Sequence, residues 1–431
     1  MTEAPLPSGG SSPSGPVPYR ERIDALRQVL LQQGSLGLLL IDVQALAQIE
    51  HQYGSDAFSK VMTMARDLVL ELHGHEVRFD DVICLNDRGG DAFLIFFSPK
   101  RREGPLRIAD LRGAAERVEG HINRKLVRLT SPYLGTLRRV TVGFALAFFN
   151  PLVMAERLVA RLVEDAWSCV RVLRAQRDLE SRCNLQEVLL SDQLSTVFQP
   201  VLDLRHRTIL GYEALSRGPA GSVYQMPLRL FEMAEQADLV FELDRKCRRR
   251  ALVSAHRLPA AAKLFVNVYP SAMYDPEFQG ASLVQLVQSQ GLTPERVVLE
   301  ITERSAIENY ELFAEALSDL TRLGFSIAVD DVGAGYSGLE KIAHLNPRYL
   351  KFDRELIRDI DSSYIRREMT RALKAFSDSI GSQIIAEGIE RQGELDALLE
   401  LGIELGQGYL LGRPAPTFLP PPSPCVPAIA G

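Results

Sequence analysis

The feature that most constrains the fold is a series of apolar, strand-length runs in the second half of the sequence, most of them followed by a stretch with helical periodicity. The runs are TVFQPVLDL, ILGYEAL, KLFVNVYP, RVVLEIT, FSIAVDDVG, YLKFD, QIIAEGIE and GQGYLLG. Because so many strand and helix units occupy about 230 residues, they predict a closed (β/α) barrel of the TIM type, with an open doubly wound sheet as the alternative. The barrel is favoured because polar residues recur at strand ends along the whole segment, whereas an open sheet would gather them at one crevice.

Polar side chains stand where these apolar runs end. Desolvating an unpaired charge costs several kcal/mol, so such residues need ionic partners or metal ions. If the strands are parallel, the side chains converge on the C-terminal face of the barrel, where barrel enzymes carry their chemistry. The residues are Glu213, Asn267, Glu300, Asp330, Asp331, Lys351, Glu387 and Gln407.

Five carboxylates and one side-chain amide in this set form an all-oxygen ligand group that suits hard divalent cations such as Mg²⁺ or Mn²⁺. The adjacent pair Asp330 and Asp331 is suited to bridging two ions, and two metals about 3.5 to 4 Å apart stabilise both the attacking and the leaving oxygen of a displacement at phosphorus. We expect Lys351 to orient the attacking water and Arg217 to bind a non-reacting phosphate oxygen. The pattern therefore indicates metal-dependent phosphodiester hydrolysis.

Each residue taken alone has a plainer interpretation. A single carboxylate at a strand end, such as Glu213, is most often a helix cap or a surface ion pair. Asp330 and Asp331 in DDVGAG could cap the following turn, and Lys351 could be a solvated strand end. The joint pattern favours the metal site, because several strand ends in one domain carry oxygen donors and no histidine takes part.

Ordered motifs make the segment from about 187 to 416 resemble an EAL domain, the barrel phosphodiesterase of cyclic di-GMP signalling. The signature Glu213-Ala214-Leu215 lies within YEALSRGP. The further motifs follow in the family's order: FVNVYP, LEITE, AVDDVGAGYSGL, LKFD, AEGIE and GQGYLLGRP. Two departures are minor, since Val332 stands where the family usually has Phe, and Ala334 where it usually has Thr or Ser.

The resemblance implies hydrolysis of cyclic di-GMP to linear pGpG with two Mg²⁺ or Mn²⁺ ions. The implied first metal site consists of Glu213, Asn267, Glu300 and Asp330, and the second of Asp330, Asp331 and Glu387. The implied catalytic residues are Lys351, which holds the water, Glu387, Asp331 and Glu303, which steadies the loop after the Asp pair. The implied substrate contacts are Gln199, Arg217 and Gln407. The alternative is a catalytically silent cyclic di-GMP receptor that signals through a protein partner, but intact metal carboxylates argue against it.

The first half of the chain predicts a separate α/β domain. Its strand-like runs are LGLLLID, DVICLND, AFLIFF and RRVTVGFALA, and the glycine pair in Arg88-Gly89-Gly90-Asp91 predicts a hairpin between the second and the third. This segment, 19–175, resembles a GGDEF domain, the diguanylate cyclase fold, through IDVQALAQIEHQYG, RGGDAF and VTVGFALA.

The departures from the GGDEF pattern fall on residues that carry chemistry. Ala92 stands where that family has a Glu that serves metal binding and catalysis, whereas Asp42 remains as a metal-ligand candidate. Glu50 replaces a guanine-reading Asn, Ala47 replaces a Lys, and Ser59 stands where a second guanine-binding Asp is expected. Because Ala offers no ligand, we expect no cyclase activity and instead a degenerate domain with a structural, dimerising or regulatory role.

We expect five segments along the chain. Both ends are rich in Pro, Gly or Ser and cannot bury enough apolar surface to fold. The helix RLVEDAWSCVRVLRAQRDLESR continues toward Leu189 as a stiff connector. The segments are a disordered tail at 1–18, a degenerate GGDEF-like domain at 19–175, a helical linker at 176–189, an EAL domain at 190–416 and a Pro-rich tail at 417–431.

Charge and composition limit the classes of partner and the cellular compartment that we expect. With 55 Asp and Glu against 49 Lys and Arg, the chain is mildly acidic, which argues against a face for DNA or anionic lipid. No stretch approaches 18 uncharged apolar residues and the N-terminus has no signal-peptide pattern, so we expect no membrane insertion. Five scattered cysteines without a CxxC pair favour the cytoplasm. The expected partners are cyclic di-GMP, a second copy of the chain in a homodimer, and a signalling protein.

Overall fold

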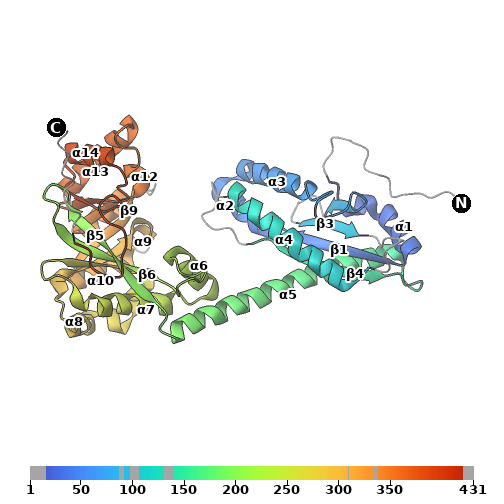
Figure 1. The fold of residues 1–431 in the computed structure, drawn as a ribbon, viewed down its shortest axis with the longest axis horizontal. Helices are drawn as coiled ribbons and strands as arrows, with labels where there is room; N and C mark the ends of the chain where they lie inside the picture. Colours follow the sequence, from blue (N-terminus) through green and yellow to red (C-terminus); the bar gives the residue numbers. More distant parts are fainter. Residues whose placement is uncertain are drawn as a thin grey trace, which may run out of the picture. The chain divides into compact units, whose positions relative to one another are not determined.

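The structure is a computed structural model that describes residues 16–86, 92–97, 106–130, 139–308, 310–333 and 338–420. Figure 1 shows the fold, with labels on many of its helices and strands. The chain divides into two compact units, Met1–Leu179 and Glu180–Gly431. Among the described helices, none combines the length and the apolar character that crossing a lipid bilayer requires.

The first unit is built on a four-stranded sheet in the order β2-β3-β1-β4, and every described pair of strands is antiparallel. The strands are β1 (Ser35–Asp42), β2 (Val82–Leu85), β3 (Ala92–Phe97) and β4 (Thr141–Phe148). The helices are α1 (Ile23–Gln33), α2 (Ala47–Tyr53), α3 (Ser55–Leu70), α4 (Ile108–Thr130) and α5 (Ala155–Leu190). The predicted pairing of β2 with β3 is confirmed, and the turn at Arg88–Asp91 lies outside the described residues.

The central strand β1 is buried along its whole length because helices cover both faces of the sheet. Leu39 and Ile41 join a core with α3 and α4, and Leu38 and Leu40 join a second core with α1 and α5. Gly143 in β4 permits the close approach of α5, since a Cβ atom there would lie 2.5 Å from the carbonyl oxygen of Ala166. The unbroken apolar run LGLLLID is thus explained by burial on both sides.

The second unit is a closed eight-stranded barrel in the order β10-β11-β12-β5-β6-β7-β8-β9, which confirms the predicted barrel over the open sheet. The strands are β5 (Ser195–Asp203), β6 (Ile209–Arg217), β7 (Lys263–Asn267), β8 (Val297–Thr302), β9 (Ser326–Val332), β10 (Tyr349–Phe352), β11 (Gln383–Ala386) and β12 (Leu405–Gly406). The helices are α6 (Pro227–Ala237), α7 (Val240–Ser254), α8 (Gly280–Ser289), α9 (Glu303–Glu308), α10 (Tyr310–Arg322), α11 (Leu339–Leu345), α12 (Arg354–Ile357), α13 (Tyr364–Ser379) and α14 (Gln392–Glu400).

Two expectations about the barrel strands are corrected. The strand β5 runs antiparallel to both of its neighbours, β6 and β12, so the barrel is not uniformly parallel. Only residues 204–208 separate β5 from β6, and a parallel crossover needs a dozen residues or more. The predicted strand GQGYLLG is also shorter than expected, because β12 ends at Gly406 and turns follow.

The start of the segment assigned to a Pro-rich tail packs on the barrel. Phe198 and Ala415 exchange two backbone hydrogen bonds of 2.7 and 3.0 Å. The ring of Phe418 lies 4.3 Å from that of Phe198 and 4.9 Å from that of Tyr212, measured between centroids. The hydroxyl of Tyr212 donates to the carbonyl oxygen of Leu419 at 2.7 Å. Residues 415–420 therefore contribute to the barrel's outer core.

A buried ion triad fixes α7 to the chain that follows β7. Arg248 donates through Nε to Asp244 at 2.7 Å and through Nη2 to Asp275 at 3.0 Å. All three residues are at most 4% exposed. The guanidinium carbon of Arg248 also lies 4.3 Å from the ring centroid of Phe278. Because both carboxylates are removed from water, they need a counter-charge, which Arg248 supplies to both and Arg245 supplies in addition to Asp275 at 3.4 Å.

We predict that Arg248→Met lowers the free energy of unfolding of the barrel unit by about 3 kcal/mol, because it leaves two buried carboxylates with a diminished counter-charge. Calorimetry and circular dichroism measure the loss. The matched control is Arg249→Met, whose side chain is 64% exposed and lies 3.8 Å from Glu277. This control should change stability by less than about 0.5 kcal/mol. Equal losses in the two variants would contradict the role given to the triad.

Candidate metal centre

Each of the eight barrel strands places one polar side chain in a single layer at one end of the barrel interior. Directly beneath it lies an apolar interior cluster that includes Phe265, Val298, Ala328, Tyr349 and Ile385. Because side chains alternate in a strand, the residue two positions farther along points into the barrel again. The polar layer is Gln199, Glu213, Asn267, Glu300, Asp330, Lys351, Glu387 and Gln407.

The polar layer thus contains every strand-end residue predicted from the sequence except Asp331, which lies beside the layer next to Asp330 and Glu387. At β6 the interior position below Glu213 is Gly211, where a Cβ atom would lie 2.9 Å from the ring of Phe265. That glycine leaves room for the large Phe265 side chain beneath the polar layer. Gln199 enters the layer from the antiparallel strand β5, directly opposite Glu213 in the strand register.

The ammonium group of Lys351 lies at the centre of the layer and is completely buried. Its Nζ atom is 2.8 Å from a carboxylate oxygen of Glu387 and 2.9 Å from one of Glu300. Asp330 and Glu213 follow at 3.3 and 3.6 Å. Four carboxylates therefore surround one cation, and this group is short of positive charge if all of its members are ionised.

The electrostatics of the layer reflect that imbalance. Burial, together with neighbouring carboxylates, raises the pKa of Glu300 and of Glu387 well above the usual range. Burial likewise raises the pKa of Asp330. A carboxylate whose charged form is disfavoured in this way regains it when a cation binds, so the layer is suited to take up positive charge.

Two members of the layer are held in their charged forms. Burial alone would lower the pKa of Lys351, but the surrounding carboxylates outweigh it and raise that pKa well above its ordinary value. Burial opposes ionisation of Glu213 too, yet the charge of Lys351 and the hydrogen bonds from Gln407 and Asn267 lower its pKa. The surroundings therefore favour the charged form of Lys351 and the charged form of Glu213 beside it.

The Asp330-Asp331 pair forms a bulge in strand β9. In the register with β10, Leu350 faces Val329 and Phe352 faces Val332, so the two aspartates stand opposite the single residue Lys351. Asp331 has φ of +59°, a left-handed conformation that Asp tolerates better than most residues. A bulge redirects side chains that would otherwise alternate between the two faces of the sheet.

At this bulge, a side-chain oxygen of Asp330 and one of Asp331 lie within 4.8 Å of each other. Burial, the charge of Asp330 and the charge of Asp353 raise the pKa of Asp331 to about 6. Asp353 was not predicted as a site residue, although it stands two residues after Lys351 in the motif LKFD. It caps α12 by accepting a hydrogen bond from the backbone nitrogen of Glu355 at 2.6 Å.

Among the described residues, two groups of carboxylates bring one oxygen from each member within 4.8 Å of one another. They share Asp330: one group is Glu213, Glu300 and Asp330, and the other is Asp330, Asp331 and Glu387. The amide nitrogen of Asn267 donates to Glu213 Oε1 at 3.1 Å. The amide oxygen of Asn267 is therefore the atom of this side chain that can serve as a metal ligand. This donor set fits two hard divalent ions that share one bridging carboxylate.

The residues predicted to contact substrate lie around Glu213. Gln407 donates from Nε2 to Glu213 Oε2 at 2.7 Å and to Gln199 Oε1 at 3.0 Å. Gln199 in turn donates to the carbonyl oxygen of Gly412 at 3.1 Å. Both glutamines are buried; Gln407 contacts Glu213 directly, and Gln199 contacts Gln407. Arg217 stands at the end of β6, half-buried, and donates to the carbonyl oxygen of Ser216 at 2.8 Å.

Glu303 connects α9 to the backbone that follows the Asp pair. Its Oε2 atom accepts a hydrogen bond from the backbone nitrogen of Gly333 at 3.2 Å, and burial raises its pKa. The side chain lies outside the polar layer, so its contact is with the loop. Ala334, which departs from the family pattern, lies outside the described residues.

The first unit carries a different polar group at its predicted metal position. Asp42 is fully buried, and its Oδ2 atom lies 2.6 Å from Arg174 of α5. Ala92 is also fully buried and stands opposite Asp42 in the register of β3 with β1. The carboxylate of Asp42 is therefore neutralised by a guanidinium, and the facing position supplies no oxygen ligand.

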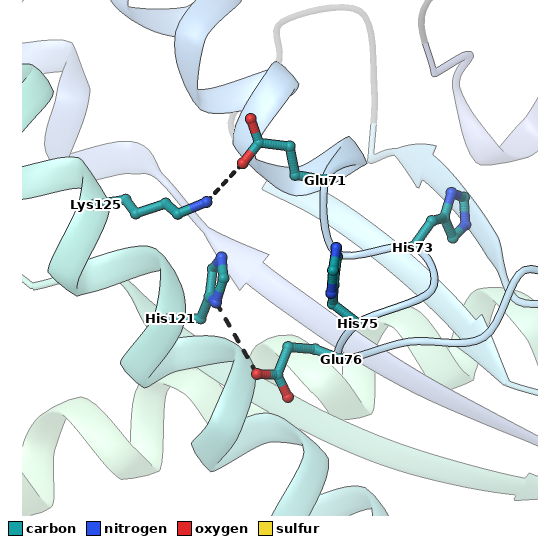
Figure 2. Close-up of a pocket in the computed structure, with 6 residues that line it drawn as sticks. All are labelled: Glu71, His73, His75, Glu76, His121 and Lys125. Carbon is teal, nitrogen blue, oxygen red and sulfur yellow. Dashed lines mark hydrogen bonds and ion pairs between the residues drawn. The ribbon is translucent and has the colours of Figure 1, made fainter.

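A separate cavity of about 570 Å³ in the first unit is lined by side chains that pair with one another. Lys125 donates to Glu71 at 2.6 Å, and His121 lies 4.0 Å from Glu76, as Figure 2 shows. Glu76 is also 3.3 Å from Arg117. Since each carboxylate already has a cationic neighbour, these contacts account for the cluster as a set of surface ion pairs.

Comparisons with known proteins concern the barrel. A family model described as "EAL domain" matches residues 182–414. The cyclic di-GMP phosphodiesterase NbdA of Pseudomonas aeruginosa is 32% identical over 255 residues, which cover 57% of this chain and 32% of that protein. The blue light- and temperature-regulated antirepressor BluF of Escherichia coli is 27% identical over 273 residues, which cover 62% of this chain and 66% of that protein. The match thus spans less than two thirds of either relative.

A solved structure titled "PaMucR Phosphodiesterase, c-di-GMP complex" superposes with a TM-score of 0.51 at 26% identity. The superposition covers 55% of this chain and 98% of that one. The residues matched by the family model include the whole barrel with its polar layer.

The raised pKa of Asp331 generates a prediction about stability. Its folded pKa of about 6 lies above the ordinary value of 3.8, so the folded state binds this proton more tightly than the unfolded chain, and stability falls as pH rises through that interval. We expect Asp331→Asn to raise the melting temperature of the chelator-treated protein relative to the parent, increasingly from pH 4 to pH 6.

Saturating Mn²⁺ supplies the control for this prediction. The ion should stabilise the parent more than Asp331→Asn, which lacks one ligand carboxylate, and should thereby narrow or reverse the difference. Scanning calorimetry of both proteins across the pH series measures the two effects. A difference that is independent of pH and of Mn²⁺ would show that Asp331 neither carries a destabilising charge nor binds metal.

Proposed function

Because this chain belongs to the EAL domain family, we propose that its barrel hydrolyses cyclic di-GMP to linear pGpG with two divalent metal ions, Mg²⁺ or Mn²⁺. The observation that carries the proposal is the pair of carboxylate groups that share Asp330 around the buried Lys351. Membership of the family alone does not require a complete donor set, so the presence of oxygen donors at all the proposed ligand positions supports an enzyme over a remnant. The NbdA phosphodiesterase, at 32% identity, supports the same reaction.

The residues of the polar layer are proposed to have different roles in metal binding and substrate binding. Glu213, Asn267, Glu300 and Asp330 are proposed to hold one ion, and Asp330, Asp331 and Glu387 the other. The two ions supply charge stabilisation for the attacking and leaving oxygens of the phosphodiester. Gln199 and Gln407 orient Glu213 and close the side of the site toward β5 and β12. Arg217 binds a non-reacting phosphate oxygen.

Lys351 is proposed to position the attacking water. Its ammonium is fixed among the carboxylates at 2.8 to 3.6 Å, so it presents a hydrogen-bond donor without reorganising during the reaction. Water adds to one phosphorus, the ester bond to the ribose oxygen breaks, and that oxygen takes up a proton. Glu303 acts indirectly, by holding the backbone at Gly333 beside the Asp pair.

A receptor without turnover is the second candidate. The BluF relative, named as an antirepressor, favours it, because such a protein acts through a macromolecular partner. In this alternative the barrel binds cyclic di-GMP, and a signalling protein binds the ligand-bound barrel. The two carboxylate groups favour the enzyme, since a binding site alone has no need of paired metal ligands around a buried lysine.

We further propose that the first unit is a degenerate GGDEF-like domain without cyclase activity, which regulates or dimerises a cytoplasmic protein. The Arg174 contact of Asp42 and the alanine at position 92 support the loss of a metal site. The substitutions at Glu50 and Ser59 remove both guanine-reading groups. What remains is a folded sheet domain joined to the barrel through α5.

The reaction is tested by incubating the full chain with cyclic di-GMP and resolving the products by chromatography. Mn²⁺ or Mg²⁺ should support formation of pGpG, and Ca²⁺ should inhibit it, because the larger, loosely coordinated ion does not hold the tight geometry of in-line attack. Parental activity in excess chelator would contradict the two-metal mechanism. Tight binding of cyclic di-GMP with Mn²⁺ but without product would favour the receptor.

Substitutions separate the metal ligands from the water-positioning residue. Asp330→Asn and Glu213→Gln should each lower kcat by about a thousandfold and weaken Mn²⁺ binding, whereas Lys351→Ala should lower kcat by about a hundredfold or more yet retain cyclic di-GMP binding in Ca²⁺. Steady-state kinetics and calorimetric titration measure the split.

The matched control for this series is Glu404→Gln, an exposed carboxylate paired with Arg205 at 3.2 Å, which should leave both quantities unchanged. Melting temperatures taken in Mn²⁺ verify that each variant is folded. If Lys351→Ala hydrolyses cyclic di-GMP at the parental rate, Lys351 does not position the attacking water. If Asp330→Asn does so, Asp330 is not a metal ligand that the reaction requires.

A further inference from the structure

Helix α6 presents two adjacent faces to two different parts of the barrel unit. Leu230 and Ala234, one turn apart, are fully buried in an apolar cluster. The next residues along the helix, Phe231 and Glu235, contact Tyr269. The cluster on the first face joins α6 to the last turns of α5 through Leu185, Val188 and Leu189.

Tyr269 is held by three contacts of different kinds. Its ring stacks on Phe231 with centroids 5.2 Å apart and planes inclined by 6°. Its hydroxyl donates to Glu235 Oε1 at 3.1 Å. Its backbone nitrogen donates to Asp244 Oδ1 of the buried ion triad at 3.3 Å. The first two contacts fix the side chain to α6, and the third fixes the backbone to α7.

The backbone that Tyr269 fixes is the one that carries Asn267. Two peptide units separate these residues, so a shift of Tyr269 displaces the end of β7. Val268, between them, donates its backbone nitrogen to the carbonyl oxygen of Glu300 at 2.8 Å. Asn267 is exposed at the rim of the polar layer, whereas Glu300 is buried, so the rim ligand depends more on its supporting loop.

We propose that Tyr269 is a positioning residue for the metal site, and that α6 couples it to the last turns of α5. A change in the packing of α5 against Leu230 and Ala234 shifts Phe231 and Glu235, because all four side chains belong to one helix. Tyr269 follows, and with it the amide oxygen of Asn267. The last turns of α5 thereby set the metal affinity of the barrel. This inference rests on the proposed metal-dependent function.

The first test measures Mn²⁺ affinity by titration with electron paramagnetic resonance, in which only free Mn²⁺ gives a sharp signal. Tyr269→Leu, which removes both the ring stack and the hydroxyl, should raise the Mn²⁺ dissociation constant about fivefold. Tyr269→Phe, which keeps the ring stack, should restore most of that affinity. Glu235→Ala, at an exposed position, should weaken Mn²⁺ binding about twofold without disturbing the core.

The matched control is Tyr274→Leu, in the same loop but 71% exposed, which should bind Mn²⁺ as the parent does. A residue with a structural role alone would lower the melting temperature and leave the Mn²⁺ affinity of the folded protein unchanged. Parental affinity in Tyr269→Leu and in Glu235→Ala would therefore overturn the positioning role.

The second test is a double-mutant cycle between α5 and Tyr269. Leu189→Ala should raise the Mn²⁺ dissociation constant about threefold in the parent and have no further effect when Tyr269→Leu is present. Leu190→Ala, at the adjacent position that is 81% exposed, is the control and should have no effect. Additive effects, or none from Leu189→Ala, would overturn the coupling through α6.

These outcomes separate the inference from the proposed function. If the parent binds no Mn²⁺, the metal mechanism fails and the inference fails with it. If the parent binds Mn²⁺ and hydrolyses cyclic di-GMP while the Tyr269 variants bind Mn²⁺ equally well, the inference alone fails.

Discussion

The contact between one buried ammonium and four carboxylates governs the barrel interior. Lys351 is within 2.8 to 3.6 Å of Glu387, Glu300, Asp330 and Glu213. Because the layer beneath consists of apolar side chains, no solvent screens this group from below, and its charges interact strongly. One cation cannot balance four ionised carboxylates, and the raised pKa values of Glu300, Glu387 and Asp330 are consistent with this deficit, so the group is suited to take up further positive charge. In the proposed function, the lysine is the fixed cation of the site, and the metal ions would be its exchangeable cations.

The geometry of that group depends on a local irregularity of the sheet. Regular alternation would point Asp330 and Asp331 to opposite faces of β9, whereas the bulge opposite Lys351 lets both serve one site. The left-handed conformation of Asp331 and the charges of Asp330 and Asp353 beside it both cost free energy at this position. A local cost of this kind at a ligand position is offset when cations bind, so backbone conformation and ligand charge contribute to the same affinity.

The sequence predicted the barrel because strand-like and helix-like segments alternate along it. It predicted most of the polar layer because polar residues recur at the ends of successive apolar strands. One carboxylate at a strand end is common, but its recurrence at strand after strand indicates a shared site. It did not predict the reversed strand β5, since direction is set by the short connection after Asp203 and by closure against β12. The bulge at Asp331 and the central place of Lys351 depend on the register between strands, which no single segment encodes. The packing of Phe418 on the barrel was missed because a proline-rich composition hides one well-placed aromatic side chain.

The proposed metal ligands differ in how firmly the fold holds them, and this difference bears on where the proposed control would act. Glu213 and Glu300 are buried within strands, and Glu213 is fixed further by Gln407 and Asn267, so moving them requires distortion of the barrel itself. Asn267 stands at the exposed end of β7, and its support is the loop that Tyr269 holds against α6. A small shift of a surface helix costs far less free energy than a shift of a barrel strand. In our proposal, a change in the last turns of α5 would therefore act on Asn267 and leave the buried carboxylates and Lys351 in place.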